Sequence, residues 1–310
     1  MSALDELRGL RRSGTQVRKR DNRAAFWFLV PWFAGLLLVT VGPVLASFGL
    51  GFTRYNLIQP PKLIGFDNFA RILSDARLHN ALRVTFTYVL VSVPLQLACA
   101  LGVALLLNRG LRGLRGLAFY RSAFYLPSLL GSSVAIAVLW TQVFGTEGLV
   151  NRVLGFFGVE GKGWISDPDT ALSTLIVLNV WTFGSPMIIF LAGLRQIPEV
   201  YYEAAAIDGA GRWSRFWRIT LPLLSPILFF NLVLQIIHAF QSFTQAFVVS
   251  GGTGGPSDST MFYTLYLYQQ GFSRFDMGYA SALAWFLLLI IAAFTAINFW
   301  AARYWVFYDD

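Results

Sequence analysis

Long apolar segments alternate with polar ones along the whole chain. Six apolar segments lie at residues 24–52, 82–107, 122–144, 171–194, 223–249 and 277–302. Each is long enough to cross a bilayer as a helix, which takes about 20 apolar residues. The pattern predicts an all-α polytopic membrane protein with six transmembrane helices, and one further short helix near residues 263–270.

Residues that disturb helices lie within several of these segments, and those in the first and fourth bear on the interpretation. Pro31 and Pro43 lie in the first, where a membrane helix tolerates them, and this segment is too long for the apolar part of a signal peptide. We therefore interpret it as a transmembrane span. In the fourth segment Gly184 and Pro186 predict a local break that exposes backbone.

Composition agrees with this interpretation. Hydrophobic residues make up 56% of the chain and charged residues 13%, whereas a soluble domain carries about 25% charged residues. The single cysteine, Cys99, lies in an apolar segment, and no intrachain disulfide can form. The net charge of +8 is better explained by membrane topology than by a nucleic-acid partner.

Arginine and lysine are distributed unevenly between the polar segments. Sixteen of the 24 lie in the N-terminal arm, the segments after the second and fourth spans and the tail, and seven lie in the other three polar segments. Positively charged loops stay in the cytoplasm, so both termini and the loop 195–221 are predicted to be cytoplasmic. The chain then divides into a cytoplasmic basic arm (1–23), a first transmembrane helix with an extracytoplasmic loop (24–81), a core with five transmembrane helices (82–302) and a cytoplasmic tail (303–310).

No motif for catalysis, metal binding or nucleotide binding is present. The only histidines are His79 and His238, and none of the three lysines stands in a P-loop. We therefore expect a protein that is not an enzyme. A secondary carrier is the alternative transport class. Proton-coupled carriers commonly place a carboxylate inside the membrane, but every Asp and Glu here lies in a loop or tail. A sodium-coupled carrier is disfavoured less strongly, since carbonyl groups can bind sodium.

Neutral polar residues recur along the fifth apolar segment. Asn231, Gln235, His238, Ser242 and Gln245 are spaced by 4, 3, 4 and 3 residues, and Gln241 and Thr244 flank them. A continuous helix places the five on one face, and polar groups in hydrocarbon need a partner or a water-filled cavity. We interpret this face as the wall of a pathway for an uncharged, hydroxyl-rich solute, with hydrogen bonding between helices as the alternative. In the fourth segment Asn179 and Trp181 are further candidates, although ordinary packing explains Trp181 equally well.

The loop 195–221 has the pattern of a helix, a turn and a second helix. Pro198 and Glu199 favour a helix start, and Asp208-Gly209 is a typical stop because glycine adopts the left-handed conformation. The second helix carries Trp213, Phe216, Trp217 and Thr220 on one face and three arginines on another. Without further information this loop would be interpreted as an amphipathic surface loop.

The same loop resembles the EAA loop of ATP-binding-cassette importer permeases. The residues that match its pattern are Glu203, Ala204, Ala205, Gly209, Ile219, Leu221 and Pro222. Stretches such as FTRYNL, IGFDNFARIL, YRSAFYLPSLL and DMGYASALAW are similar to the carbohydrate group of these permeases, in particular its MalF/UgpA-like subunit. The large extracytoplasmic insertion and extra N-terminal spans of the enterobacterial maltose permease are absent.

The resemblance implies a type I importer permease (MetI-like) fold with a cytoplasmic EAA coupling helix in a bacterial inner or plasma membrane. ATPase coupling would fall to Glu203, Ala204, Ala205, Asp208 and Gly209, and sugar contacts to Asn179, Gln241, Thr244 and Gln245. The implied partners are a second homologous permease, an extracytoplasmic solute-binding protein and two ATPase subunits. These subunits would bind ATP and magnesium, whereas this chain would bind no cofactor. Disaccharides, polyols and glycerol phosphodiesters all remain open as substrates, and the few positive charges in the spans favour a neutral sugar.

Overall fold

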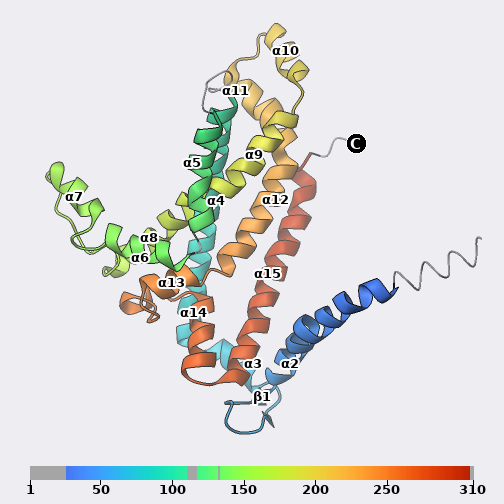
Figure 1. The fold of residues 1–310 in the computed structure, drawn as a ribbon, viewed down its shortest axis with the longest axis vertical. Coiled ribbons are helices and arrows are strands. Elements are labelled where there is room, and N and C mark those ends of the chain that lie inside the picture. Colours follow the sequence, from blue (N-terminus) through green and yellow to red (C-terminus); the bar gives the residue numbers. More distant parts are fainter. Residues whose placement is uncertain (1–25, 110–116, 132, 308–310) are drawn as a thin grey trace, which may run out of the picture.

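The computed structural model describes residues 26–109, 117–131 and 133–307. Long helices dominate it (Figure 1), with α4, α9, α12 and α15 side by side as a bundle. The short helix α10 lies beyond one end of this bundle, and β1 lies beyond the other. The two ends carry different chemistry, and both are described below.

The bounds of the elements follow chain order. The helices are α2 (Gly42–Leu50), α3 (Asp67–Ser74), α4 (Ala76–Arg109), α5 (Leu117–Leu130), α6 (Val134–Val143), α7 (Leu149–Phe156), α8 (Pro168–Trp181), α9 (Gly184–Gln196), α10 (Glu199–Ile207), α11 (Arg212–Arg215), α12 (Leu221–Phe240), α13 (Thr244–Val249), α14 (Tyr263–Tyr268) and α15 (Met277–Trp305). The π-helical turns are η1 (Leu36–Val41), η2 (Phe216–Thr220) and η4 (Gln269–Ser273), and η3 (Pro256–Asp258) is a 3₁₀ turn. Two short antiparallel strands, β1 (Thr53–Arg54) and β2 (Lys62–Leu63), complete the fold.

The predicted membrane spans are largely confirmed within the described residues. Five helices are long and apolar enough to cross a membrane, namely Phe26–Leu50, Ala76–Asn108, Pro168–Gln196, Arg212–Val249 and Met277–Trp305. The short helix expected near residues 263–270 is α14, which η4 continues.

The third span is not the single continuous helix predicted over residues 122–144. Instead α5 and α6 meet at an angle of 99°. The backbone N–H of Gly131 closes the end of α5 by donating to the Pro127 carbonyl oxygen over 2.8 Å, and Ser133 begins α6 by accepting from the Ile136 N–H over 3.3 Å. A serine cap of this kind starts a new helix in a new direction, so α5 and α6 give a sixth span only if the bent pair counts as one.

The expected break in the fourth span is confirmed between α8 and α9, at Thr182 and Phe183. Gly184, directly after the break, is buried where α9 meets α5. A Cβ atom at this position would lie 2.5 Å from the Phe124 carbonyl oxygen. Glycine is therefore required for the two backbones to approach this closely.

Helix α4 is the centre of the packing, because α8, α9, α12 and α14 all contact it. The core contains fully buried residues of each of these helices, among them Leu78, Leu175, Phe190 and Tyr263. The first span is different. Its most apolar window has no buried residue, and Figure 1 shows it extending away from the bundle.

Ion pairs and hydrogen bonds hold the helices together at the end of the bundle opposite α10. The Asp75 carboxylate accepts hydrogen bonds from the hydroxyls of Tyr266 and Tyr279, over 2.5 and 2.8 Å. Arg71 pairs with Asp276 over 2.7 Å, and its guanidinium lies 3.8 Å from the centre of the Tyr279 ring. These contacts join the start of α4 to α14 and α15, close to 200 residues later in the chain.

A second ion pair connects α4 to the glycine-rich turn before α14. Arg77 donates two hydrogen bonds of 2.8 Å to the Asp258 carboxylate, and Asn80 donates to the Asp258 carbonyl oxygen over 3.1 Å. A two-pronged arginine–carboxylate pair fixes orientation as well as distance. The turn is therefore held against α4 on the side where α14 begins.

We predict that Asp75→Asn lowers the free energy of unfolding by about 1.5–3 kcal/mol at neutral pH, the range for hydrogen bonds to charged groups. Thermal melting of the purified protein in detergent measures the change. Glu160→Gln, which alters an exposed carboxylate, is the matched control and should leave the melting temperature unchanged.

The same variant should show a pH dependence. Burial alone would raise the pKa of Asp75, but the hydroxyls of Tyr266 and Tyr279, the Leu78 N–H and the charge of Arg71 outweigh burial and hold this pKa below its ordinary value. A carboxylate with a lowered folded-state pKa stabilises the protein above the unfolded pKa, and this stabilisation is lost as the pH falls through the folded pKa. The difference between wild type and Asp75→Asn should therefore narrow below about pH 4, and an unchanged difference there would contradict the assignment.

Candidate functional site

The coupling segment, residues 199–220, forms the tip of the molecule at the α10 end (Figure 1). The predicted first helix is α10, and the predicted stop is confirmed because Gly209 has a φ of +75°. The Ala210 N–H donates to the Ala205 carbonyl oxygen over 2.8 Å, which closes the end of α10 in the manner of a Schellman motif. The sequence therefore encodes a short helix with a defined end.

Two side-chain contacts hold the two arms of the coupling segment together. The Tyr202 hydroxyl of α10 lies 3.0 Å from the hydroxyl of Thr220, where η2 meets α12. The Arg215 Nε of α11 donates to the Ala210 carbonyl oxygen over 2.7 Å. The arms are thus fixed relative to each other, while Glu203, Ala204, Asp208 and Gly209 remain exposed and Ala205 is half-buried.

The predicted second helix consists of α11 and η2. Its aromatic residues pack on one another, with the Trp213 and Phe216 rings stacked at 5.8 Å. Trp213 is nevertheless 73% exposed, and Ile207 at the end of α10 is 87% exposed. Large apolar side chains at the tip of a protruding segment are typical of a surface that contacts another protein.

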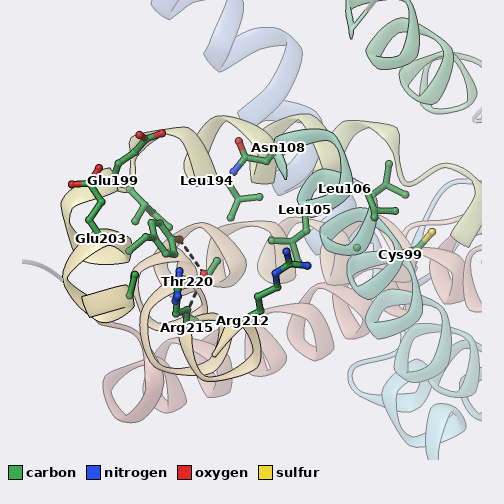
Figure 2. A pocket seen from close by; sticks show the side chains of 15 residues that line it. Cys99, Leu105, Leu106, Asn108, Leu194, Glu199, Glu203, Arg212, Arg215 and Thr220 are labelled. Atoms are coloured by element: carbon green, nitrogen blue, oxygen red, sulfur yellow. Dashed lines mark hydrogen bonds between the residues drawn. The ribbon is translucent and has the colours of Figure 1, made fainter. Parts of the chain in front are cut away.

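A hollow of about 1210 Å³ lies between the coupling segment and the ends of α4 and α9. Figure 2 shows Glu199 and Glu203 of α10 on one side of it, Arg212 and Arg215 of α11 near the other arm, and leucines of α4 further in. The hollow therefore has an apolar inner wall and a rim that carries both signs of charge.

One of the two candidate residues of the fourth span, Asn179, forms a hydrogen bond with α4. The Asn179 amide donates to Gln96 Oε1 over 3.4 Å, and Gln96 Nε2 donates to the Thr182 hydroxyl over 3.0 Å. Thr182 in turn donates to the Asn179 carbonyl oxygen over 2.7 Å. Gln96 did not emerge from the sequence as a functional candidate, although a single amide in an otherwise apolar span is a usable signal.

Trp181 packs beside a second tryptophan. Its ring lies 6.0 Å from the Trp140 ring, and Trp140 Nε1 donates to the Thr174 carbonyl oxygen over 3.0 Å. Two tryptophans from α6 and α8 therefore form an aromatic pair next to the Asn179 bonds. Sequence reasoning missed Trp140, because only the bend between α5 and α6 brings it to α8.

The single polar face predicted for the fifth span is interrupted. The helix α12 ends at Phe240, and α13 begins at Thr244, with non-helical backbone between them. The spacing of 4, 3, 4 and 3 therefore does not describe one helical face beyond residue 240, which corrects that inference. The break could not be seen in the sequence, because residues 241–243 contain no proline or glycine.

At the break and directly after it, the side chains of Ser242 and Gln245 make hydrogen bonds within the protein. Gln245 Nε2 donates to the Gly131 carbonyl oxygen over 3.0 Å, and the Ser242 hydroxyl donates to Gln245 Oε1 over 3.2 Å. The Gly131 carbonyl lies at the α5–α6 bend. Two helix breaks, one in each span, thus satisfy each other's polar groups.

The polar residues of α12, and Gln241 directly after its last residue, behave differently. Gln235, His238 and Gln241 make no side-chain hydrogen bond to any residue that the structure describes, and both His238 and Gln241 are exposed. Gln241 lines a hollow of about 720 Å³ whose other lining residues, including Leu287, Ile291 and Thr295, all belong to α15. Asn231 is buried, and its amide donates to the Ile227 carbonyl oxygen over 3.2 Å.

Over the described residues, no group of three or more His, Cys, Asp or Glu side chains is arranged to hold a metal ion. The two features that stand out are instead a rigid, exposed coupling segment at one end and unpaired neutral polar groups along the inner part of a span.

The family is established by comparison. Residues 85–306 match the family of binding-protein-dependent transport system inner membrane components, and the chain belongs to it. It is 50% identical over 294 residues to the probable ABC transporter permease protein YesP of Bacillus subtilis (strain 168), with 94% of each chain covered. It is 33% identical over 282 residues to the lactose transport system permease protein LacF of Rhizobium radiobacter, which covers 89% of this chain and 93% of the relative.

The fold is also known from a solved structure. A chain of a bacterial ABC transporter involved in the import of the acidic polysaccharide alginate superposes with a TM-score of 0.79 at 23% identity, covering 94% of this chain and 98% of that one. The expected permease fold is confirmed. The secondary-carrier alternative is removed by the family assignment.

We predict that Gly209→Ala opens the end of α10. A residue with a Cβ in the left-handed conformation costs about 1–2 kcal/mol, so the backbone amides of α10 should exchange hydrogen about tenfold faster. Hydrogen exchange followed by mass spectrometry measures this. The matched control is Gly211→Ala, since Gly211 has a φ of –67° and no atom within 4 Å of an added Cβ. Equal exchange in the two variants would contradict the role of Gly209.

Proposed function

We propose that this protein is the permease subunit of an ATP-binding-cassette importer that takes up a neutral sugar, most simply a disaccharide. The main structural support is the coupling segment. Its helix α10 is exposed and has a defined end at Gly209, and two hydrogen bonds join the segment to the start of a membrane span. The family assignment supports the importer, and the lactose permease of Rhizobium radiobacter, 33% identical, supports a sugar as the solute.

We further propose that the coupling segment is cytoplasmic, as are both termini. The excess of arginine and lysine in the segments on that side supports this orientation. Glu203, Ala204, Ala205, Asp208 and Gly209 would then contact one of two ATPase subunits, and the exposed apolar residues beside them would enlarge the contact. ATP and magnesium would be bound by those subunits, and this chain would act as a transport component without a catalytic site.

The remaining partners follow from the same proposal. The end of the bundle opposite α10, where Asp75 and Asp258 make their contacts, would face an extracytoplasmic binding protein, which delivers the sugar. A second, homologous permease would complete the pathway. The first span supports such a partner, because its most apolar window has no buried residue and only its end, α2, packs against α15.

The pathway itself is proposed to pass along α12. Gln235, His238 and Gln241 would form its wall, because neutral amides and an imidazole without protein partners need water or a solute to bond with. Asn179, Ser242, Thr244 and Gln245 would form the layer beside this wall, with Trp181 next to them. The bonds of Asn179 and Gln245 to neighbouring helices support this division.

We predict that Glu203→Lys leaves membrane insertion and protein level unchanged but weakens retention of the ATPase subunits by about tenfold, equivalent to ~1.4 kcal/mol. The reason is the reversed charge at the centre of the docking helix. Copurification and sugar-stimulated ATP hydrolysis measure the effect. Glu147→Lys reverses an exposed charge in the loop between α6 and α7 and serves as the control. Normal assembly and stimulation in Glu203→Lys would overturn the docking role.

We predict that His238→Leu and Gln241→Leu each reduce uptake by a few-fold to about tenfold, since each hydrogen bond to the solute contributes ~0.5–1.5 kcal/mol, without changing thermal stability. Gln245→Leu should instead lower the melting temperature, because it leaves the Gly131 carbonyl without its donor. Uptake is measured in proteoliposomes with the cognate binding protein and a panel of disaccharides, polyols and glycerol phosphodiesters. If His238→Leu lowered only stability, the proposed wall would be wrong, and uptake of phosphodiesters alone would contradict a neutral sugar.

A further inference from the structure

The helix α7 has its apolar side turned outward. Leu149, Val153, Phe156 and Phe157 are 62%, 48%, 91% and 79% exposed. At 100° per residue these four side chains lie on one face of the helix. A surface helix of a soluble domain shows the opposite arrangement, with its polar face outward. Figure 1 shows α7 at the outer end of the segment 145–164, away from the bundle of α4, α9, α12 and α15.

The opposite side of α7 makes the hydrogen bonds to the rest of the protein. Asn151 donates to the carbonyl oxygens of Thr146 and Lys162, each over 2.8 Å, and accepts from Trp164 Nε1 over 2.6 Å. These bonds close the hairpin 145–164 around the polar side of the helix. The orientation of the apolar face is therefore fixed by the structure and does not result from an unsupported loop.

We propose that this outward face lies in the interfacial region of the lipid bilayer and anchors the hairpin 145–164 to the membrane surface. The preceding helix α6 also carries exposed apolar side chains, namely Val134, Val138 and Leu139. Arg152 stands at the border of the α7 face, where an arginine can reach lipid phosphates while its stem stays with apolar groups. Aromatic and aliphatic residues on one face with a cation beside them are the usual composition of interfacial helices.

Residue type and size both favour lipid over a protein partner. Lys162, which pairs with Asp167 over 3.1 Å, lies 5.3 Å from the centre of the Trp164 ring, so a cation and an indole stand together at the base of the hairpin, a combination typical of the headgroup layer. The outward face consists of four side chains, whereas a stable protein interface takes about 20–30 residues on each side. In the orientation proposed above, the leaflet concerned is the extracytoplasmic one.

The test uses nitroxide labels on the complete importer in proteoliposomes. In a Cys99→Ala background, labels are attached at Phe156→Cys and, separately, at Val153→Cys on the outward face. Gly155→Cys is the matched control one residue away, since Gly155 lies on another side of α7 and an added Cβ there meets no atom within 4 Å. Accessibility of each label to oxygen, which concentrates in lipid, and to a water-soluble nickel chelate is measured by power saturation.

We expect the Phe156 and Val153 labels to be several-fold more accessible to oxygen than to nickel, and the Gly155 label to show the reverse. Nickel accessibility at Phe156 and Val153 equal to that at Gly155 would overturn the proposal, because the face would lie in water. Protection of both labels from both reagents would also overturn it, because a protein would then cover the face. Neither outcome depends on uptake or ATP hydrolysis, so failure here is distinguishable from failure of the proposed transport function.

Discussion

A polar group inside hydrocarbon must either bond to another part of the protein or face water. This constraint explains the arrangement of the spans. Where the fourth and fifth spans break, the amides of Asn179 and Gln245 bond to α4 and to the α5–α6 bend. The breaks are therefore compensated by contacts between helices. Gln235, His238 and Gln241 lack such a bond to any residue of the described chain, as the buried Ser92 hydroxyl of α4 does. Because His238 and Gln241 are also exposed, these residues of the fifth span are the ones proposed to bond to the solute.

The membrane spans could be predicted from the sequence because their signal is local. Length and apolar character alone locate the five long helices, and the stop at Asp208-Gly209 depends only on the conformational freedom of glycine. The family resemblance of the coupling segment is equally local, since it is a run of residue types at fixed spacing. These features require no knowledge of what the rest of the chain does.

The parts that could not be predicted depend on distant partners. The break before Thr244 is stabilised by a bond from Gln245 to Gly131, 114 residues earlier. The Asp75 contacts join residues that are 191 and 204 positions apart. No periodicity within a window of the sequence contains such pairs. Because the break was not visible in the sequence, the regular spacing from Asn231 to Gln245 suggested one helical face. The structure instead has two separate groups that differ in their hydrogen bonds.

The placement of the coupling segment bears on how a movement of α10 could reach the proposed pathway. Two residues separate the end of α9 from the start of α10, and η2 continues directly into α12. The bond between Tyr202 and Thr220 joins both junctions, so a displacement of α10 acts on the ends of two spans at once. Since α12 is continuous from Leu221 to Phe240, such a displacement would be carried along about 25 Å of helix to His238. At the far end, the ion pairs around Asp75 and Asp258 hold α4, α14 and α15 together, which leaves the break at residues 241–243 as the point where α12 can change direction relative to them.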